Sequence, residues 1–154
     1  MGPPADPPPS AGRFEGREHR LPVRVYYEDT DFTGVVYHAN FLRYFERGRS
    51  DFLRLAGVGH AELLDRADPA AFTVTKMALR FRAPARIDDA LLVRTTFDRA
   101  RGVRLQITQK VTRGDVLIAE AEVEVVCISL DGRPRRPPEG MMALLTPWFS
   151  SDTP

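Results

Sequence analysis

Residues 40–56 read NFLRYFERGRSDFLRLA, and they decide the fold because no other stretch keeps a helical period for so long. The residues that recur on one face at helical spacing are Phe41, Phe45, Gly48, Phe52 and Leu55. The residues that fall mainly on the opposite face are Arg43, Arg47, Asp51 and Arg54. Gly57 follows at a position where helices favour a left-handed residue. We therefore predict an amphipathic helix about 25 Å long over residues 40–56.

The segments around this helix have the two-residue period of half-buried strands. Val23, Val25 and Tyr27 alternate with polar neighbours before the helix. Four more strand patterns follow it, at 72–81, 91–97, 103–111 and 117–127. The first of the four loses its alternation near Thr75–Lys76, which predicts a β-bulge, and short turns at 101–102 and 113–115 predict hairpins. This order predicts an α+β fold, in which a five-stranded antiparallel sheet has its apolar face covered by one long helix.

Proline marks the ends of the chain. Of the 13 prolines, five lie in residues 1–20 and five in residues 134–154. The first residues contain too few apolar side chains to offset the entropy of ordering them. We predict a disordered proline-rich leader over residues 1–18, one domain over 19–147 and a loose tail over 148–154.

Composition excludes several functional classes. The formal net charge is +1, so no overall field favours nucleic acid or an anionic membrane. No apolar run approaches the ~20 residues that an integral membrane helix needs, and the N-terminus does not resemble a signal peptide. The single cysteine, Cys127, cannot form an internal disulfide, which favours a reducing compartment. We expect a cytoplasmic protein with no integral membrane segment and no nucleic-acid partner.

Familiar catalytic and metal-binding motifs are absent from the sequence. It contains no G-x-S-x-G, no Walker loop and no G-x-G-x-x-G after a strand. Its histidines, His19, His38 and His60, are scattered, and no C-x-x-C or H-x-x-x-H brings metal ligands together. We therefore expect neither a metal site nor a cofactor.

The junction between the first strand and the helix concentrates polar chemistry. Glu28, Asp29 and Asp31 place three carboxylates within four residues. If the loop is packed, desolvation and mutual repulsion raise the pKa of a carboxyl group and make it a candidate base or nucleophile. The loop leads into a helix N-terminus, whose free amides stabilise an oxyanion. In the alternative interpretation Asp29, Thr30 and Asp31 only form a turn and Asn40 is a helix N-cap.

A longer pattern around this loop resembles a known family. Residues 23–41 read VRVYYEDTDFTGVVYHANF and are followed by FERGR at 45–49. They closely resemble the YbgC-type, Tol-Pal-associated acyl-CoA thioesterases, in the 4-hydroxybenzoyl-CoA thioesterase branch of the hotdog superfamily. Further matches occur at 83–89 and 121–127, and the similarity spans about residues 21–145. The sequence departs from the family at Phe32-Thr33, where two small residues are usual, and at Gly48, where Ala is usual.

The resemblance implies a hotdog fold, with five antiparallel strands wrapped around a central helix, and assigns roles to single residues. Asp31 would be the catalytic carboxylate, acting as general base or as nucleophile. Gly34 would permit the tight turn, and the His38 N–H would polarise the thioester carbonyl. The His38 side chain would contact substrate or water, or else pack as a structural imidazole. The residues expected to line the substrate are Gly34, Val35, Tyr37 and Glu46, although Glu46 could instead only pair along the helix with Arg43, Arg49 or Ser50.

The implied activity is hydrolysis of an acyl-CoA thioester to a free acid and coenzyme A. The implied assembly is a homodimer or homotetramer with the site between protomers, and residues 75–86 would approach the partner's loop. Surface arginines would meet the phosphates of coenzyme A; the candidates are Arg82, Arg86, Arg99, Arg101 and Arg104. Two alternatives stay open: a non-catalytic hotdog module that binds acyl carrier protein or an envelope complex, and a hotdog enoyl-CoA hydratase.

Overall fold

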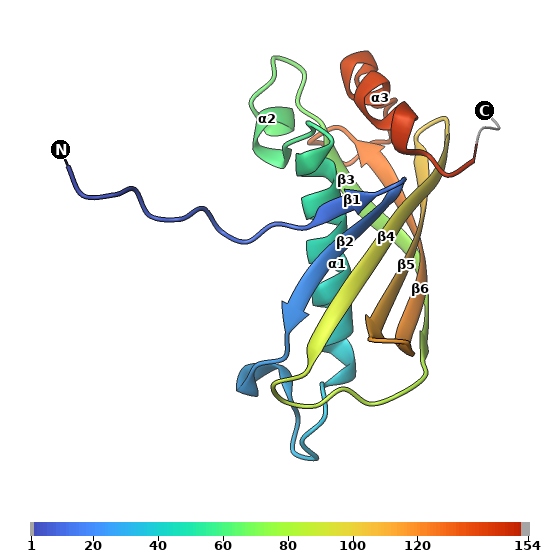
Figure 1. Cartoon of the computed structure of the whole chain (residues 1–154). Coiled ribbons are helices and arrows are strands. Elements are labelled where there is room, and N and C mark those ends of the chain that lie inside the picture. The colour runs from blue at the N-terminus through green and yellow to red at the C-terminus, as the bar shows by residue number, and fades with distance from the viewer. Residues whose placement is uncertain (1, 152–154) are drawn as a thin grey trace.

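The computed structural model describes residues 2–151. It shows one antiparallel sheet with the strand order β1-β2-β4-β5-β6-β3, and a long helix, α1, that lies across one face of the sheet (Figure 1). The strands are β1 Arg13–Glu15, β2 Glu18–Arg24, β3 Ala71–Phe81, β4 Ala90–Arg101, β5 Arg104–Arg113 and β6 Val116–Ile128. The helices are α1 His38–Leu55, α2 His60–Leu64 and α3 Glu139–Leu145, with single turns η1 Tyr27–Asp29 and η2 Thr146–Trp148. The predicted α+β class is confirmed, but the sheet has six strands rather than five, and two short helices accompany the long one.

The sheet follows the alternation of the sequence closely. The inward residues of β4 are Leu91, Val93, Thr95 and Phe97, and all are buried. The predicted irregularity in β3 is present, because the pairing of β3 with β6 shifts between Val74 and Lys76. The predicted first strand ends early, at Arg24, and Tyr27 is exposed within η1 instead of facing the core. Among residues 2–151, no helix is both long and apolar enough to cross a membrane.

Helix α1 buries most of the face predicted to pack on the sheet, but the predicted burial is wrong for two of its residues. Phe41, Phe45 and Phe52 are buried as expected. Leu55 is 42% exposed, whereas Asp51, expected on the outer face, is only 4% exposed. Asp51 is buried because the N-terminal segment covers it.

This covering begins inside the predicted leader. The Gly12 N–H donates to Asp51 Oδ2 at 2.8 Å, and His19 Nε2 lies 2.7 Å from the same oxygen. Burial, followed by the positive charge of Arg54, lowers the pKa of His19 to about 4. Because β1 occupies Arg13–Glu15, the predicted boundary of the leader at residue 18 is too late.

The predicted loose tail is also shorter than expected. Trp148 stacks on Phe14 with ring centroids 3.9 Å apart, and Phe149 is buried. The Ser150 N–H donates to the Phe97 carbonyl at 3.0 Å. Residues 148–151 therefore belong to the fold, because Trp148 and Phe149 pack against its apolar side chains and Ser150 bonds to β4. Residues 152–154 lie outside the described part of the chain.

Gly48 lets α1 approach the sheet closely. A Cβ atom at this position would lie 2.7 Å from Thr95 Oγ1, 2.8 Å from Val93 Cγ1 and 3.1 Å from Gln109 Nε2. Threonine and valine are branched at Cβ and cannot swing aside easily. The absence of a side chain at residue 48 therefore sets the distance between helix and sheet.

We predict that Gly48→Ala, the residue usual in the family, destabilises this chain. Overpacking costs about 1–3 kcal/mol, and the better helix propensity of Ala returns only about 1 kcal/mol. The free energy of unfolding, measured by urea titration, should fall by up to about 2 kcal/mol. Gly140→Ala in α3 is the control, since a Cβ atom there would meet no atom of the described residues within 4 Å. A stability gain at both glycines would contradict the proposed close approach.

Candidate functional site

The loop between β2 and α1 folds back on itself as a small hairpin. Thr30 and Val36 form an antiparallel bridge, and the Asp31 N–H donates to the Val35 carbonyl at 2.9 Å. The Gly34 N–H donates to the Asp31 carbonyl at 3.0 Å, and Gly34 has a φ of +82°, which glycine adopts without strain. The turn predicted at Gly34 thus presents Asp31 at its first position.

The hairpin is fastened to the rest of the fold on both sides. The Val36 N–H donates to the Ala85 carbonyl at 2.8 Å, in the loop that follows β3. On the other side the Asp29 carbonyl accepts from the Tyr37 N–H at 2.9 Å and from Asn40 Nδ2 at 2.8 Å. Asn40 is therefore not the N-cap that one interpretation expected: α1 begins at His38 with Tyr37 as its N-cap, and Asn40 ties the helix to the loop.

The two aspartates of the loop have different partners. Asp29 Oδ2 accepts from the Tyr26 N–H at 2.8 Å and closes the η1 turn. Asp31 Oδ1 accepts from the Thr33 N–H at 2.8 Å and from the Thr33 hydroxyl at 2.6 Å. These bonds from Thr33, the hydroxyl first, lower the pKa of the Asp31 carboxyl below its ordinary value. The expected increase in pKa is therefore wrong, because the loop is exposed and its carboxylate is hydrogen-bonded rather than desolvated.

Asp31 lines an open cavity of about 520 Å³ at the end of the molecule. Its walls are formed by Tyr27, Thr30, Asp31, Phe32, Gly34 and Ile87. Phe32 is fully exposed at the tip of the hairpin. The cavity thus places an ionised carboxylate beside three exposed apolar side chains, Tyr27, Phe32 and Ile87, which suits a substrate with an apolar part.

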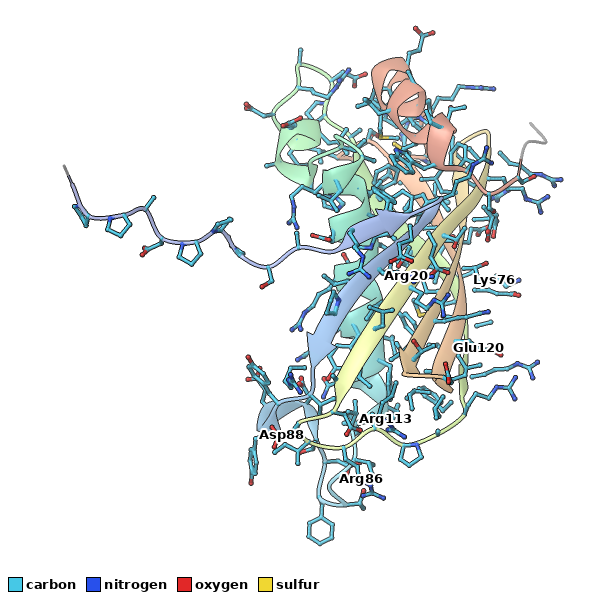
Figure 2. All side chains as sticks on the ribbon, in the orientation of Figure 1. Arg20, Lys76, Arg86, Asp88, Arg113 and Glu120 are labelled. Atoms are coloured by element: carbon cyan, nitrogen blue, oxygen red, sulfur yellow. The ribbon has the colours of Figure 1, made fainter. Side chains whose placement is uncertain are left out.

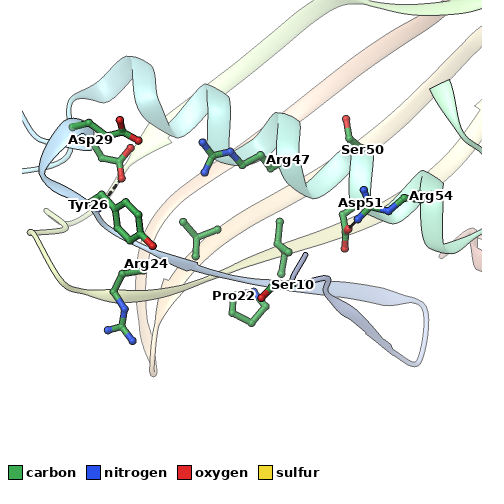
Figure 3. A pocket seen from close by; sticks show the side chains of 12 residues that line it. Ser10, Pro22, Arg24, Tyr26, Asp29, Arg47, Ser50, Asp51 and Arg54 are labelled. Carbon is green, nitrogen blue, oxygen red and sulfur yellow. Dashed lines mark hydrogen bonds and ion pairs between the residues drawn. The ribbon is translucent and has the colours of Figure 1, made fainter. Parts of the chain in front are cut away.

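Asp29 faces the other side of the loop. It lines a groove of about 470 Å³ between α1 and β2, together with Arg47 and Arg54 (Figure 3). Two acidic groups of this groove have partners, since Asp29 bonds to Tyr26 and Asp51 pairs with Arg54, whereas Glu28 forms no hydrogen bond or ion pair with the described residues. Asp31 is thus the aspartate of this loop that lines the cavity at the end of the molecule, and its Oδ2 accepts no hydrogen bond from the described residues.

The structure unites only some of the predicted site residues. Gly34 lines the Asp31 cavity, whereas Val35, Tyr37 and His38 do not. Tyr37 and His38 are both exposed, with their ring centroids 4.5 Å apart, and the His38 ring lies 6.2 Å from that of Phe81. Among the described residues, no hydrogen bond joins His38 to Asp31.

Glu46 lies further along α1 and belongs to another cavity. Its carboxylate pairs with Arg49 and accepts from the Ser50 hydroxyl at 3.2 Å, so two of the pairings considered from the sequence are present. This second cavity, of about 60 Å³, lies between α1 and the sheet and has apolar walls that include Leu53 and Phe97. Within one chain, Glu46 and Asp31 therefore line separate spaces.

A buried polar cluster lies under α1 and was not predicted from the sequence. Arg49 is buried, and its Nη1 donates to Gln109 Oε1 at 2.9 Å. Gln109 Nε2 donates in turn to the Phe45 carbonyl at 2.8 Å and to Thr95 Oγ1 at 2.9 Å. A signal was present in the sequence, because Gln109 occupies an inward position between Ile107 and Val111 in an otherwise apolar face.

The five candidate arginines are separated by the fold. The backbone of Arg86 bridges to Val35, which places Arg86 at the same end as Asp31 (Figure 2). Arg82 pairs with Glu120 at 2.8 Å. The remaining three candidates, Arg99, Arg101 and Arg104, lie at the turn between β4 and β5, at the opposite end of the sheet (Figure 1).

Comparison with known proteins places these observations in a family. The sequence model of the thioesterase-like superfamily matches residues 25–145. The acyl-CoA thioester hydrolase YbgC of Escherichia coli is 44% identical over 126 residues, which cover 80% of this chain and 92% of that protein. The acyl-CoA thioesterase YbgC of Haemophilus influenzae is 39% identical over 110 residues, or 71% of this chain and 80% of that protein.

A solved structure agrees with the sequence relatives. The crystal structure of a probable thioesterase from Bartonella henselae superposes with a TM-score of 0.76 at 41% identity, covering 79% of this chain and 99% of that one. The match of the family model includes the hairpin, α1 and strands β3 to β6. The chain therefore belongs to the thioesterase-like superfamily.

Proposed function

We propose that this protein is an acyl-CoA thioesterase, which uses water to cleave an acyl-CoA into a free acid and coenzyme A. The observation that carries the proposal is the ionised Asp31 carboxylate, held at the tip of a hairpin that leads directly into α1. The printed activity of relatives up to 44% identical supports the same reaction. Hydrolysis by a carboxylate, water and backbone amides requires no metal or organic cofactor.

The chemistry follows from two features of this end of the molecule. Asp31 either removes a proton from water as water attacks the thioester carbon, or attacks that carbon itself and is released by water later. Both routes need the anionic carboxylate. The carbonyl oxygen becomes negative in the transition state, and the free N–H groups at the start of α1, that of His38 first, would stabilise it. The C–S bond then breaks, and coenzyme A leaves as a thiolate that takes up a proton derived from the attacking water.

We predict that Asp31→Asn abolishes hydrolysis without unfolding the chain. Asparagine can still accept the two bonds from Thr33, but it cannot take a proton from water or attack as an anion. Turnover of a good acyl-CoA substrate should fall by about 10²–10⁴-fold, with circular dichroism and oligomeric mass unchanged.

Asp29→Asn is the matched control for this prediction. It lies in the same loop, where its side chain closes the η1 turn and interacts with the Tyr44 hydroxyl, and it does not line the Asp31 cavity, so turnover should stay within about threefold of wild type. Equal losses in the two variants would show that the loop is merely structural. A wild-type chain that binds acyl-CoA without releasing thiol would support the non-catalytic module, and addition of water to an enoyl-CoA would support the hydratase.

We further propose that Arg86 contributes to binding the phosphates of coenzyme A. It lies beside the Asp31 cavity, its side chain is exposed, and no hydrogen bond or ion pair occupies its guanidinium among the described residues. The planar guanidinium of arginine can donate two parallel hydrogen bonds to a phosphate group. The attraction between these charges weakens as the salt concentration rises.

We predict that Arg86→Ala raises KM for acyl-CoA by about three- to tenfold, as expected for one exposed charge contact, while kcat changes little. Salt should raise KM of the wild type more than that of the variant. Arg101→Ala, at the far end of the sheet, is the control and should leave KM unchanged. Equal KM values for wild type and Arg86→Ala at low salt would exclude the contact.

We also propose that the protein is at least a dimer, joined along β3. This strand has 11 residues and lies at the edge of the sheet, so its outer backbone groups lack strand partners within the described part of the chain. Val74 is 45% exposed and Phe81 is 50% exposed. A long edge strand with exposed apolar side chains is suited to pairing with another copy. Such pairing would bring Thr75–Arg86 of one protomer toward the Asp31 loop of its partner.

We predict a mass at least twice the chain mass of 17.3 kDa in light scattering at micromolar concentration. Val74→Lys should shift the population toward monomer, because it places a charge on the proposed interface. Val116→Lys is a control of similar exposure, at 44%, on the strand β6 instead. A monomeric wild type would contradict the proposed assembly.

A further inference from the structure

We infer that Thr33 is a positioning residue for the reaction: it holds the Asp31 carboxylate in one orientation, with Oδ1 occupied and Oδ2 left for water or substrate. This inference rests on the proposed role of Asp31. Thr33 is one of the two residues, Phe32 and Thr33, that replace the small residues usual in the family. The inference explains what the threonine hydroxyl contributes.

The geometry that supports the inference is a double contact on one oxygen. Asp31 Oδ1 accepts from the Thr33 N–H at 2.8 Å and from the Thr33 hydroxyl at 2.6 Å. The backbone of Asp31 is itself fixed, because its N–H bonds to Val35 and its carbonyl accepts from Gly34. The side-chain torsions of Asp31 are then its remaining freedom, and the two bonds from Thr33 restrict them.

The hydroxyl is the part of this arrangement that the residue type decides. Any residue but proline at position 33 supplies the backbone N–H, so a small residue would preserve that bond. Only Ser or Thr adds a short hydroxyl donor in the same turn. Asp31 Oδ2 has no hydrogen-bond partner among the described residues, which leaves that oxygen available.

The other charged and titratable groups near Asp31 form no side-chain contact that could hold its carboxylate in place of Thr33. Tyr27 shares its cavity, Glu28 and Asp29 precede it, and His38 begins α1. Arg86, Asp88 and Asp89 lie in the loop that packs against the hairpin, where Asp89 pairs with Arg113 at 2.9 Å. Within the described residues, none of these side chains forms a hydrogen bond or ion pair with Asp31.

The same hydrogen bond affects the protonation of Asp31. A donor that favours the carboxylate lowers its pKa, as observed here with the Thr33 hydroxyl as the largest cause. Removal of the hydroxyl should therefore raise the pKa. The active anion would then be lost at a higher pH as the solution is acidified, so the acidic limb of kcat/KM should move upward in pH.

The experiment compares Thr33→Val, which keeps the shape of threonine without its hydroxyl, with Thr33→Ser, which keeps the hydroxyl. In the full-length protein, Thr33→Val should move the acidic limb of kcat/KM upward by about 0.5–1 pH unit. It should also lower the plateau of kcat by about three- to tenfold through lost orientation. Thr33→Ser should restore both quantities to near the wild-type values.

Thr30→Val is the matched control. Thr30 lines the same cavity, but its hydroxyl donates to the Tyr27 carbonyl at 2.8 Å and not to Asp31. The acidic limb of kcat/KM for Thr30→Val should coincide with that of the wild type. A carbon-13 NMR titration of the Asp31 carboxyl group should show the same order of pKa values in all four proteins, without relying on turnover, and thermal unfolding should confirm that each variant folds.

Two results would overturn the inference: an acidic limb and NMR pKa that do not move in Thr33→Val, or a Thr33→Ser variant that behaves like Thr33→Val. These failures are distinguishable from failure of the proposed function. If Asp31→Asn is inactive while the Thr33 series leaves the limb unmoved, only the role of Thr33 is wrong. If Asp31→Asn remains active, the proposed mechanism itself is wrong.

Discussion

The contact between α1 and the sheet at Gly48 is the constraint on which the rest of the structure depends. Without a Cβ at this position, the helix backbone comes close enough for Gln109 Nε2 to donate to the Phe45 carbonyl. Apolar packing around this point is not directional, whereas the bonds of Gln109 to Thr95 and Arg49 are. The buried polar cluster therefore selects one position of the helix along the sheet.

That position also determines where the helix begins. Its N-terminus at His38 meets a hairpin that is fastened to Asn40 on the helix side and to Ala85 on the sheet side. The hairpin is exposed, yet its backbone is hydrogen-bonded at both ends. These bonds restrict the movement of a reactive group on the loop, which helps to pre-organise the site.

The electrostatics of the site rest on hydrogen bonding rather than on burial. Asp31 is only partly buried and receives two bonds from Thr33, so its pKa is lowered and the carboxylate remains anionic at neutral pH. His19 is the opposite case. It is buried beside Asp51, and burial lowers its pKa until the imidazole is neutral at neutral pH. The accessible Asp31 carboxylate at the cavity is thus charged, whereas the buried His19 imidazole in the core is neutral.

The sequence by itself determined the elements that depend on neighbouring residues: the long helix, the alternation of the strands and the bulge near Lys76. The family resemblance singled out Asp31. Tertiary structure alone decided that Asp51 and Arg49 are buried, that Leu55 is exposed, and that Phe14 and Trp148 close one end of the sheet. It also decided the direction of the pKa change at Asp31. The physical reason is that the burial of a polar group, and the sign of its pKa shift, depend on partners and on solvent exposure that only the folded chain defines.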